Sequence, residues 1–278
     1  MAQEDKKTMT RREAIRHIGL GTLMLAGGFT LATGCKGKND EKPGKYVMAF
    51  RKDNVTGRGV SLLGYGCMRF PTYETDELDN RGRKIKAIDM KKSQEIIDYA
   101  YEKGINHFDT AWNYHNEKSA VAIGQMLKKY PRESFTLANK MPGWLITGPE
   151  KAQELFEEQL RRCDVEYFDY YLCHAISTKE GYDKPYEELG GYDVLAKEKE
   201  NGRIKRLGFS FHGKKTVFDE VIALHDRYHW DFVQIELNYL DWDYADEISK
   251  NNVDASYLYA ELQKRGIPAV IMEPLLGG

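Results

Sequence analysis

Four side chains that can hold or move a proton follow three successive apolar segments of the chain. Asp109 and Tyr114 lie in the string FDTAWNYHNE, Lys140 ends TLANK, and His174 ends YYLCH. A phenol has an ordinary pKa of about 10, too high for a good acid at neutral pH, and a nearby ammonium lowers it. We therefore expect Lys140 to lower the pKa of Tyr114, with Asp109 keeping the ammonium charged and aimed. A neutral His174 can donate a hydrogen bond to a carbonyl oxygen, so the set predicts protonation of an alkoxide formed by hydride reduction.

Alternating strands and helices are the elements expected to position these side chains. Short apolar segments predict seven strands, at residues 60–70, 105–111, 134–140, 167–175, 203–211, 231–239 and 268–276. Amphipathic segments predict six helices, at residues 92–103, 118–129, 150–162, 186–200, 214–226 and 256–265. This rhythm implies parallel strands joined by right-handed crossovers.

Two folds share that rhythm, a doubly wound sheet and a (β/α)₈ barrel. The segment 64–69 reads GYGCMR and lacks the third glycine of the dinucleotide-binding fingerprint, which argues against the doubly wound sheet. Barrel enzymes build their sites at the carboxyl ends of the strands. Polar residues stand at six such ends: Asp109, Lys140, His174, Ser210, Asn238 and Glu273.

Taken singly, several of these residues have simpler interpretations. Asp109 could cap a turn and Lys140 could be solvated. His107 and His115 are expected to pack or to lie at the surface, and His225 and His229 to lie on a solvated helix face. For His212 and Trp112, a place in the site and a structural role are equally open.

Composition excludes some functional classes. The 278 residues are 41% hydrophobic and 30% charged, which excludes both a disordered chain and a polytopic membrane protein. The net charge of −2 provides no overall basic field for nucleic acid. No C-x-x-C string occurs, so Cys67, Cys163 and Cys173 are expected to be buried thiols, with no metal site.

The first 34 residues predict an export signal. A basic stretch at residues 1–17 precedes an uncharged apolar stretch at 18–34, although a short membrane anchor remains an alternative. Residues 10–15 resemble a twin-arginine motif, and residues 31–35 resemble a lipobox with Cys35 as the lipidated residue. We expect a polar tether at 35–57, and a lipoprotein held at the membrane of the periplasm or cell envelope.

The ordered strings of residues 58–278 resemble the aldo/keto reductase family. These strings are GYGCMR, FDTAWNYHNEKSAVAIG, LANK, YYLCH, GRIKRLGFSFHG, FVQIELNY and VIMEPLLGG. The resemblance implies a (β/α)₈ barrel that binds NADP(H) and interconverts a carbonyl and an alcohol on a small molecule. By matching position, Tyr114 is then the general acid, Lys140 and Asp109 tune it, and His174 orients the substrate carbonyl.

The same resemblance assigns the cofactor contacts. Ser210 and Gln234 match residues that contact the nicotinamide amide. Phe211 stands where the family usually has Asn, and Met272 where it usually has a stacked aromatic residue. The remaining expected cofactor-binding residues are Gly66, Met68, Pro274 and Leu275.

A narrower resemblance connects the leader to the body. The strings GFSFHG and IMEPLLGG resemble an exported bacterial branch of the family that carries a C-terminal 4Fe–4S ferredoxin-like domain. That domain is absent here, so we expect a barrel truncated after its seventh strand and a cluster only beyond residue 278. Electron transfer with an iron–sulfur domain and non-catalytic binding remain alternatives. The sequence does not indicate the oligomeric state.

Overall fold

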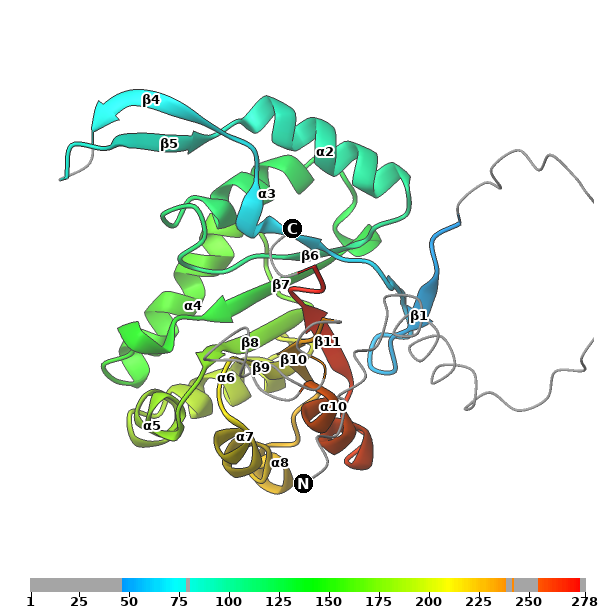
Figure 1. Ribbon diagram of the computed structural model, residues 1–278, viewed down its shortest axis with the longest axis vertical. Coiled ribbons are helices and arrows are strands. Elements are labelled where there is room, and N and C mark those ends of the chain that lie inside the picture. The colour runs from blue at the N-terminus through cyan, green and yellow to red at the C-terminus, as the bar shows by residue number, and fades with distance from the viewer. Residues whose placement is uncertain (1–46, 79–80, 239–241, 243–254, 276–278) are drawn as a thin grey trace, which may run out of the picture. The chain divides into compact units, whose positions relative to one another are not determined.

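A seven-stranded parallel sheet forms the centre of the protein (Figure 1). The computed structural model describes residues 47–78, 81–238, 242 and 255–275. In order across the sheet, the strands are β3 (Tyr65–Gly66), β6 (His107–Asp109), β7 (Thr136–Met141), β8 (Tyr170–Ile176), β9 (Leu207–Phe211), β10 (Phe232–Glu236) and β11 (Ala269–Met272). Since this order follows the chain, each strand pairs with the next, and each connection crosses over on the helical side.

The helices between the strands cover the outer face of this sheet. They are α2 (Met90–Glu102), α3 (Ser119–Leu127), α4 (Pro149–Cys163), α5 (Lys179–Tyr182), α6 (Gly191–Glu200), α7 (Lys215–Ile222), α8 (His225–Tyr228) and α10 (Ala255–Lys264). Helix α4 shows why they form: Pro149 begins it, and Leu155, Phe156 and Leu160 are buried at helical spacing. No described helix has the length and apolar character needed to cross a membrane.

The two faces of each strand have different roles. In β9, Phe209 and Phe211 pack outward against the helical layer, where Phe211 meets the Phe218 ring at 5.1 Å. Because side chains alternate along a strand, Gly208 and Ser210 face the inside of the curled sheet. Lower on the inner face, a small apolar cluster fills the space; it consists of Ala138, Tyr170, Leu172 and Phe232, with Val270 against it.

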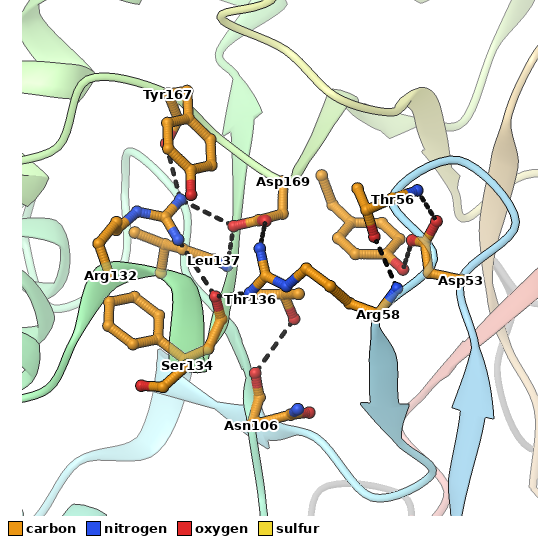
Figure 2. Close-up of polar contacts among 12 residues, drawn as sticks. Asp53, Thr56, Arg58, Asn106, Arg132, Ser134, Thr136, Leu137, Tyr167 and Asp169 are labelled. Carbon is orange, nitrogen blue, oxygen red and sulfur yellow. Dashed lines mark hydrogen bonds and ion pairs between the residues drawn. The ribbon is translucent and has the colours of Figure 1, made fainter.

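A hairpin closes the amino ends of the strands. It consists of β1 (Phe50–Lys52) and β2 (Gly59–Ser61). Figure 2 shows Arg58 bonded to Asp169, which directly precedes β8, with Arg132 on the same carboxylate. Asp53 pairs with Arg206, which directly precedes β9, at 2.5 and 2.6 Å. The tether expected at residues 35–57 is therefore wrong from Val47 onward, since residues 47–57 belong to the folded unit.

The two edge strands of the sheet approach each other at their carboxyl ends. Arg69 follows β3 through the short helix η1 (Cys67–Arg69), and Glu273 follows β11. The Arg69 guanidinium lies 3.3 Å from the Glu273 carboxylate. No strand in residues 47–78, 81–238 or 255–275 pairs with the outer side of either edge. The predicted α/β fold is confirmed as seven parallel strands curled into a half-barrel.

Four local elements differ from the prediction, and one of them is the helix expected at 214–226, which is divided into α7 and α8. The segment 60–70 is not one strand but β2, β3 and η1. The helix expected at 186–200 is divided into a π-helical turn, η4 (Asp183–Glu188), and α6, because Gly190 adopts a left-handed φ of 69° between them. A hairpin of β4 (Thr72–Leu78) and β5 (Lys84–Ile88) extends from the body (Figure 1). Most of its side chains are exposed, so it lacks the apolar alternation that predicts a strand.

Candidate active site

Lys140 is the centre of the polar cluster at the carboxyl ends of the strands. It is the fifth residue of β7, and its side chain is only 2% exposed. The Nζ group bonds to the Asp109 carboxylate, donates to the Thr110 carbonyl oxygen at 2.9 Å, and lies 3.3 Å from the Tyr114 hydroxyl. Three partners therefore take the three protons of the ammonium, and their positions fix its direction.

The Asp109 carboxylate keeps Lys140 charged despite its burial. Burial by itself would lower the pKa of Lys140, but the adjacent Asp109 and Tyr114 oxygens outweigh it and raise the pKa above its ordinary value. Gln234 of β10 holds the other side of Asp109, with Nε2 at 3.4 Å from Oδ2. Asp109 thus lies between the Lys140 ammonium and the Gln234 side chain.

The pKa of Tyr114 differs in direction from the sequence expectation. Burial raises the pKa of its hydroxyl above the ordinary value, and the opposing effect of Lys140 is smaller. The expectation that Lys140 lowers this pKa was wrong for the net shift, because it left out the cost of ionising a phenol away from water. Tyr114 is consequently protonated at neutral pH, which is the form that can give up a proton.

His174 faces Tyr114 from β8, which is two strands away from β6 in the sheet. Their rings are 6.2 Å apart in an edge-to-face arrangement. Burial lowers the pKa of His174 well below its ordinary value, and the nearby Lys140 and His212 lower it further. The ring is therefore neutral, and its Nδ1 atom has no hydrogen-bond partner among the described residues. Tyr186 fixes the backbone here, since its hydroxyl accepts from the His174 N–H at 3.1 Å and donates to the Met141 carbonyl oxygen at 3.0 Å.

An unusual turn carries Tyr114. The loop leaves β6 at Asp109, and the Ser119 N–H closes it by bonding to the Tyr114 carbonyl oxygen at 3.2 Å. Between them, His115, Asn116 and Glu117 adopt left-handed φ values of 51°, 52° and 67°. For residues other than glycine this conformation costs roughly 1–2 kcal/mol each. Contacts elsewhere must offset that cost.

Ser210 and Gln234 fit the amide group of a nicotinamide. Both are buried on the inner face of β9 and β10, at paired positions of the two strands. The Ser210 hydroxyl oxygen accepts from the Ala175 N–H at 2.8 Å, which leaves its own proton free to donate. The Gln234 Oε1 atom is buried with no hydrogen-bond partner among the described residues, and a ligand amide would satisfy it.

The other residues expected at the cofactor lie at the carboxyl ends of the two edge strands, β3 and β11. Gly66 ends β3, and Met68, which is 48% exposed, lies two residues later in η1. Met272 ends β11, and Pro274 and Leu275 follow it as exposed residues. The structure thus places the seven expected cofactor residues on β3, β9, β10 and β11 or just beyond them.

Comparison with known proteins decides the family. The profile of the Aldo/keto reductase family matches residues 62–278. This chain belongs to the aldo/keto reductase family. A probable aldo-keto reductase from Glycine max is 32% identical over 71% of this chain and 54% of its own length. An NADH-specific methylglyoxal reductase from Escherichia coli is 26% identical over 69% of this chain and 59% of its own length.

Solved aldo/keto reductases share the fold. The holo form of an aldo-keto reductase from Bacillus halodurans superposes with a TM-score of 0.62 at 22% identity, over 83% of this chain and 68% of that one. A Bombyx mori aldo-keto reductase in complex with NADP gives 0.56 at 18% identity, over 82% and 67%. This chain spans about half the length of the curated aldo/keto reductases it matches.

Two further side chains of this aldo/keto reductase lie near His174: Trp144, which the sequence did not single out, and His212, for which a place in the site was left open. The exposed Trp144 ring lies 5.4 Å from the His174 ring. The His212 Nδ1 atom is bonded to the Glu236 carboxylate at 2.5 Å. These two residues follow Ser210 and Gln234 by two positions each, on the neighbouring chain segments of β9 and β10. The Phe211 side chain packs outward against Phe218, so it does not reach the site. The polar side chain that follows Ser210 at this end of β9 is therefore His212. Trp144 follows Lys140 by four residues, and that short spacing is the signal that could have found it.

Other chemistry-bearing residues have structural surroundings. Cys67, Cys163 and Cys173 are free and buried, as expected, and burial raises the pKa of the Cys163 thiol to about 12. Trp112 is buried in the hydrophobic core, which favours a structural role over a place in the site. Among residues 47–78, 81–238 and 255–275, no group of three or more His, Cys, Asp or Glu could hold a metal. The cysteines present do not fit an iron–sulfur cluster, and Cys35 lies outside the described residues.

Proposed function

We propose that this protein is an oxidoreductase that interconverts a carbonyl and an alcohol with NADP(H), using Tyr114 as general acid and base. The observation that carries the proposal is the single ammonium of Lys140, bonded to Asp109 and placed 3.3 Å from the Tyr114 hydroxyl. A buried lysine with a carboxylate on one side and a phenol on the other supports proton transfer through that phenol.

Reduction needs one hydride and one proton. A reduced nicotinamide held by Ser210 and Gln234 would supply the hydride. Tyr114 donates its hydroxyl proton to the oxygen, which becomes the alcohol, and the phenolate that remains is stabilised by the Lys140 ammonium. The phenolate then regains a proton from water. In alcohol oxidation Tyr114 acts in reverse and accepts the proton.

His174 orients the carbonyl oxygen. A neutral imidazole has one N–H donor, and burial together with Lys140 keeps this ring neutral by holding its pKa well below the ordinary range. With their rings 6.2 Å apart, His174 and Tyr114 could both donate a hydrogen bond to one carbonyl oxygen placed between them. An oxygen held this way develops negative charge between two donors.

The buried Ser210 hydroxyl and the partnerless Gln234 Oε1 atom support nicotinamide binding. The NADP-bound Bombyx mori structure supports NADP(H), whereas the Escherichia coli relative is NADH-specific. We take NADP(H) as the form used and expect NADPH to bind with lower Kd than NADH, measured by protein-induced fluorescence changes of each; a lower Kd for NADH would overturn this choice.

Turnover of methylglyoxal with NADPH is the direct test of the proposed activity. Tyr114→Phe keeps the ring and removes only the hydroxyl, so kcat is expected to fall by roughly 10²–10⁴-fold. NADPH binding should stay within twofold of the unchanged protein. Full turnover by Tyr114→Phe would contradict the assignment of Tyr114, and absence of NADPH binding at high micromolar protein would contradict the cofactor.

We further propose that the protein is exported and lipid-anchored, as in the branch that carries a 4Fe–4S domain. The twin-arginine-like residues 10–15, the lipobox-like residues 31–35 and the strings GFSFHG and IMEPLLGG support this. Metabolic labelling with a radioactive fatty acid is expected to label the protein and not its Cys35→Ser variant. Equal labelling of both would overturn the anchor.

A further inference from the structure

The backbone after Tyr114 holds a conformation that its residues do not favour. His115, Asn116 and Glu117 are three consecutive left-handed residues, and none is glycine. Conformations of this kind persist only where surrounding contacts hold them, and they gather at functional sites. The contacts that hold this turn therefore bear on where the Tyr114 hydroxyl lies.

One end of the turn is tied to the segment after β3. The His115 Nε2 atom accepts from the Phe70 N–H at 3.0 Å, and the two rings lie 5.6 Å apart. The Lys118 N–H bonds back to the His115 carbonyl oxygen at 3.2 Å. His115 is thus a structural residue, as expected from sequence.

The other contact comes from a single arginine of α4. The Arg162 guanidinium carbon lies 3.8 Å from the centroid of the Trp112 ring. Its Nη2 atom bonds to the Glu117 carboxylate at 2.9 Å, and its Nε atom to Glu158 at 2.8 Å. Trp112 precedes Tyr114 by two residues and Glu117 follows it by three, so one side chain grips the loop on both sides of Tyr114.

The neighbouring arginine shows that this contact is specific. Arg161 lies on the same helix and bonds to the same Glu158 carboxylate, at 2.6 and 2.7 Å. Its side chain is 73% exposed, against 15% for Arg162. Among the described residues, the Arg161 guanidinium pairs with Glu158 and not with Trp112 or Glu117, which makes Arg161 a matched comparison for the charge and the helix position.

We propose that Arg162 is a positioning residue that fixes the Tyr114 hydroxyl between Lys140 and His174 by gripping Trp112 and Glu117. This proposal rests on the proposed role of Tyr114 in proton transfer. A planar guanidinium stacks on an indole face and bonds to a carboxylate at its edge, which an aliphatic side chain of the same length cannot do. Without it, the left-handed turn relaxes and the hydroxyl moves away from Lys140.

The test compares Arg162→Met with Arg161→Met in the full chain, using methylglyoxal and NADPH. For Arg162→Met we expect kcat to fall by roughly 10- to 100-fold, because small misplacements of a reacting group have effects of this size. KM and the Kd for NADPH should stay within about twofold. Arg161→Met should leave all three unchanged. A kcat for Arg162→Met within twofold of the unchanged protein would overturn the proposal.

A second readout does not depend on activity. The ultraviolet titration of Tyr114 is obtained as the difference between each protein and the same protein carrying Tyr114→Phe. In Arg162→Met the raised pKa of Tyr114 is expected to move back toward about 10, because the relaxed hydroxyl gains water. An unchanged titration would mean that Arg162 serves stability alone and would also overturn the proposal.

A milder variant covers the case in which Arg162→Met does not fold. Glu117→Gln removes only the ion pair at a half-exposed carboxylate, and it should reproduce the kcat loss in the same direction. Combining the two substitutions should lower kcat less than the product of their separate effects, since both loosen one grip. If Tyr114→Phe retains turnover, the proposed function fails. If Tyr114→Phe abolishes turnover while Arg162→Met and Glu117→Gln keep the kcat of the unchanged protein, only the positioning role fails.

Discussion

The Lys140 ammonium bonds to the Asp109 carboxylate and lies 3.3 Å from the Tyr114 hydroxyl, deep at the carboxyl ends of β6 and β7. One buried cation thus connects a carboxylate that holds it charged with a phenol that benefits from its charge. The Lys140 side chain is almost completely buried and Asp109 is largely so. The charge of each therefore depends on the other for compensation.

Asp109→Asn tests this dependence. It leaves the Lys140 charge buried without its counter-ion, and the free energy of unfolding is expected to fall by about 3–5 kcal/mol. The pKa of Lys140 should fall as well, because the carboxylate that raises it is gone. Urea unfolding measures the first effect. Asp164→Asn, which breaks the exposed Lys128–Asp164 pair, is the control and should change stability by less than about 1 kcal/mol.

Stability is expected to fall in mild acid because His174 is buried and neutral. The folded pKa of His174 lies well below about 6.5, its value in the unfolded chain. Below about pH 6.5 the unfolded state therefore binds the extra proton, and the free energy of unfolding falls by about 1.4 kcal/mol per pH unit until the folded pKa is reached. Above that pH this group contributes no slope. Burial also lowers the pKa of His107, so this residue adds to the fall in the free energy of unfolding at acid pH.

Urea unfolding between about pH 7 and 5 measures this slope. His174→Gln cannot take up a proton, so its slope should be shallower by about 1.4 kcal/mol per pH unit. Equal slopes for the two proteins would show that His174 titrates alike in the folded and unfolded states.

The Asp53–Arg206 pair at the opposite end of the strands is expected to act on stability alone. Both side chains are under 10% exposed, and Arg206 holds the pKa of Asp53 well below its usual range. Arg206→Met leaves the Asp53 charge unpaired and should reduce the free energy of unfolding by about 3–5 kcal/mol. The kcat of the folded protein should stay the same. Arg206→Met combined with Asp53→Asn removes the buried charge but keeps an acceptor for the Val55 and Thr56 N–H groups, so it should recover much of the loss; a further loss would argue against this account.

Trp144 is expected to set preference among carbonyl substrates. Its ring is 54% exposed and lies 5.4 Å from His174, so it offers an apolar wall beside the carbonyl position. Trp144→Ala should raise KM about tenfold for an aromatic aldehyde such as 4-nitrobenzaldehyde, with little change for methylglyoxal. Because the ring is exposed, the thermal midpoint should be unaffected. Equal changes in KM for both aldehydes would remove Trp144 from the substrate wall.

Local patterns in the sequence were enough to predict the seven parallel strands and the clustering of Asp109, Tyr114, Lys140 and His174 at their carboxyl ends. Each strand is a short apolar segment, and Asp109, Lys140 and His174 lie at or near the carboxyl ends of three of them. Parallel strands in chain order bring their carboxyl ends to one edge, so strand order alone predicted which side chains meet. The hairpin of β4 and β5 was missed because its pairing buries little and leaves no apolar pattern.

Only the tertiary structure decided how these residues behave. The net rise in the pKa of Tyr114 comes from burial, which depends on the elements around the phenol and not on its spacing from Lys140. Likewise, Arg162 reaches Trp112 and Glu117 from a helix 45 or more residues away in sequence. Types and order of residues along the chain determined which groups could react. Desolvation and contacts between distant segments decided their protonation and position, because both depend on distances in space.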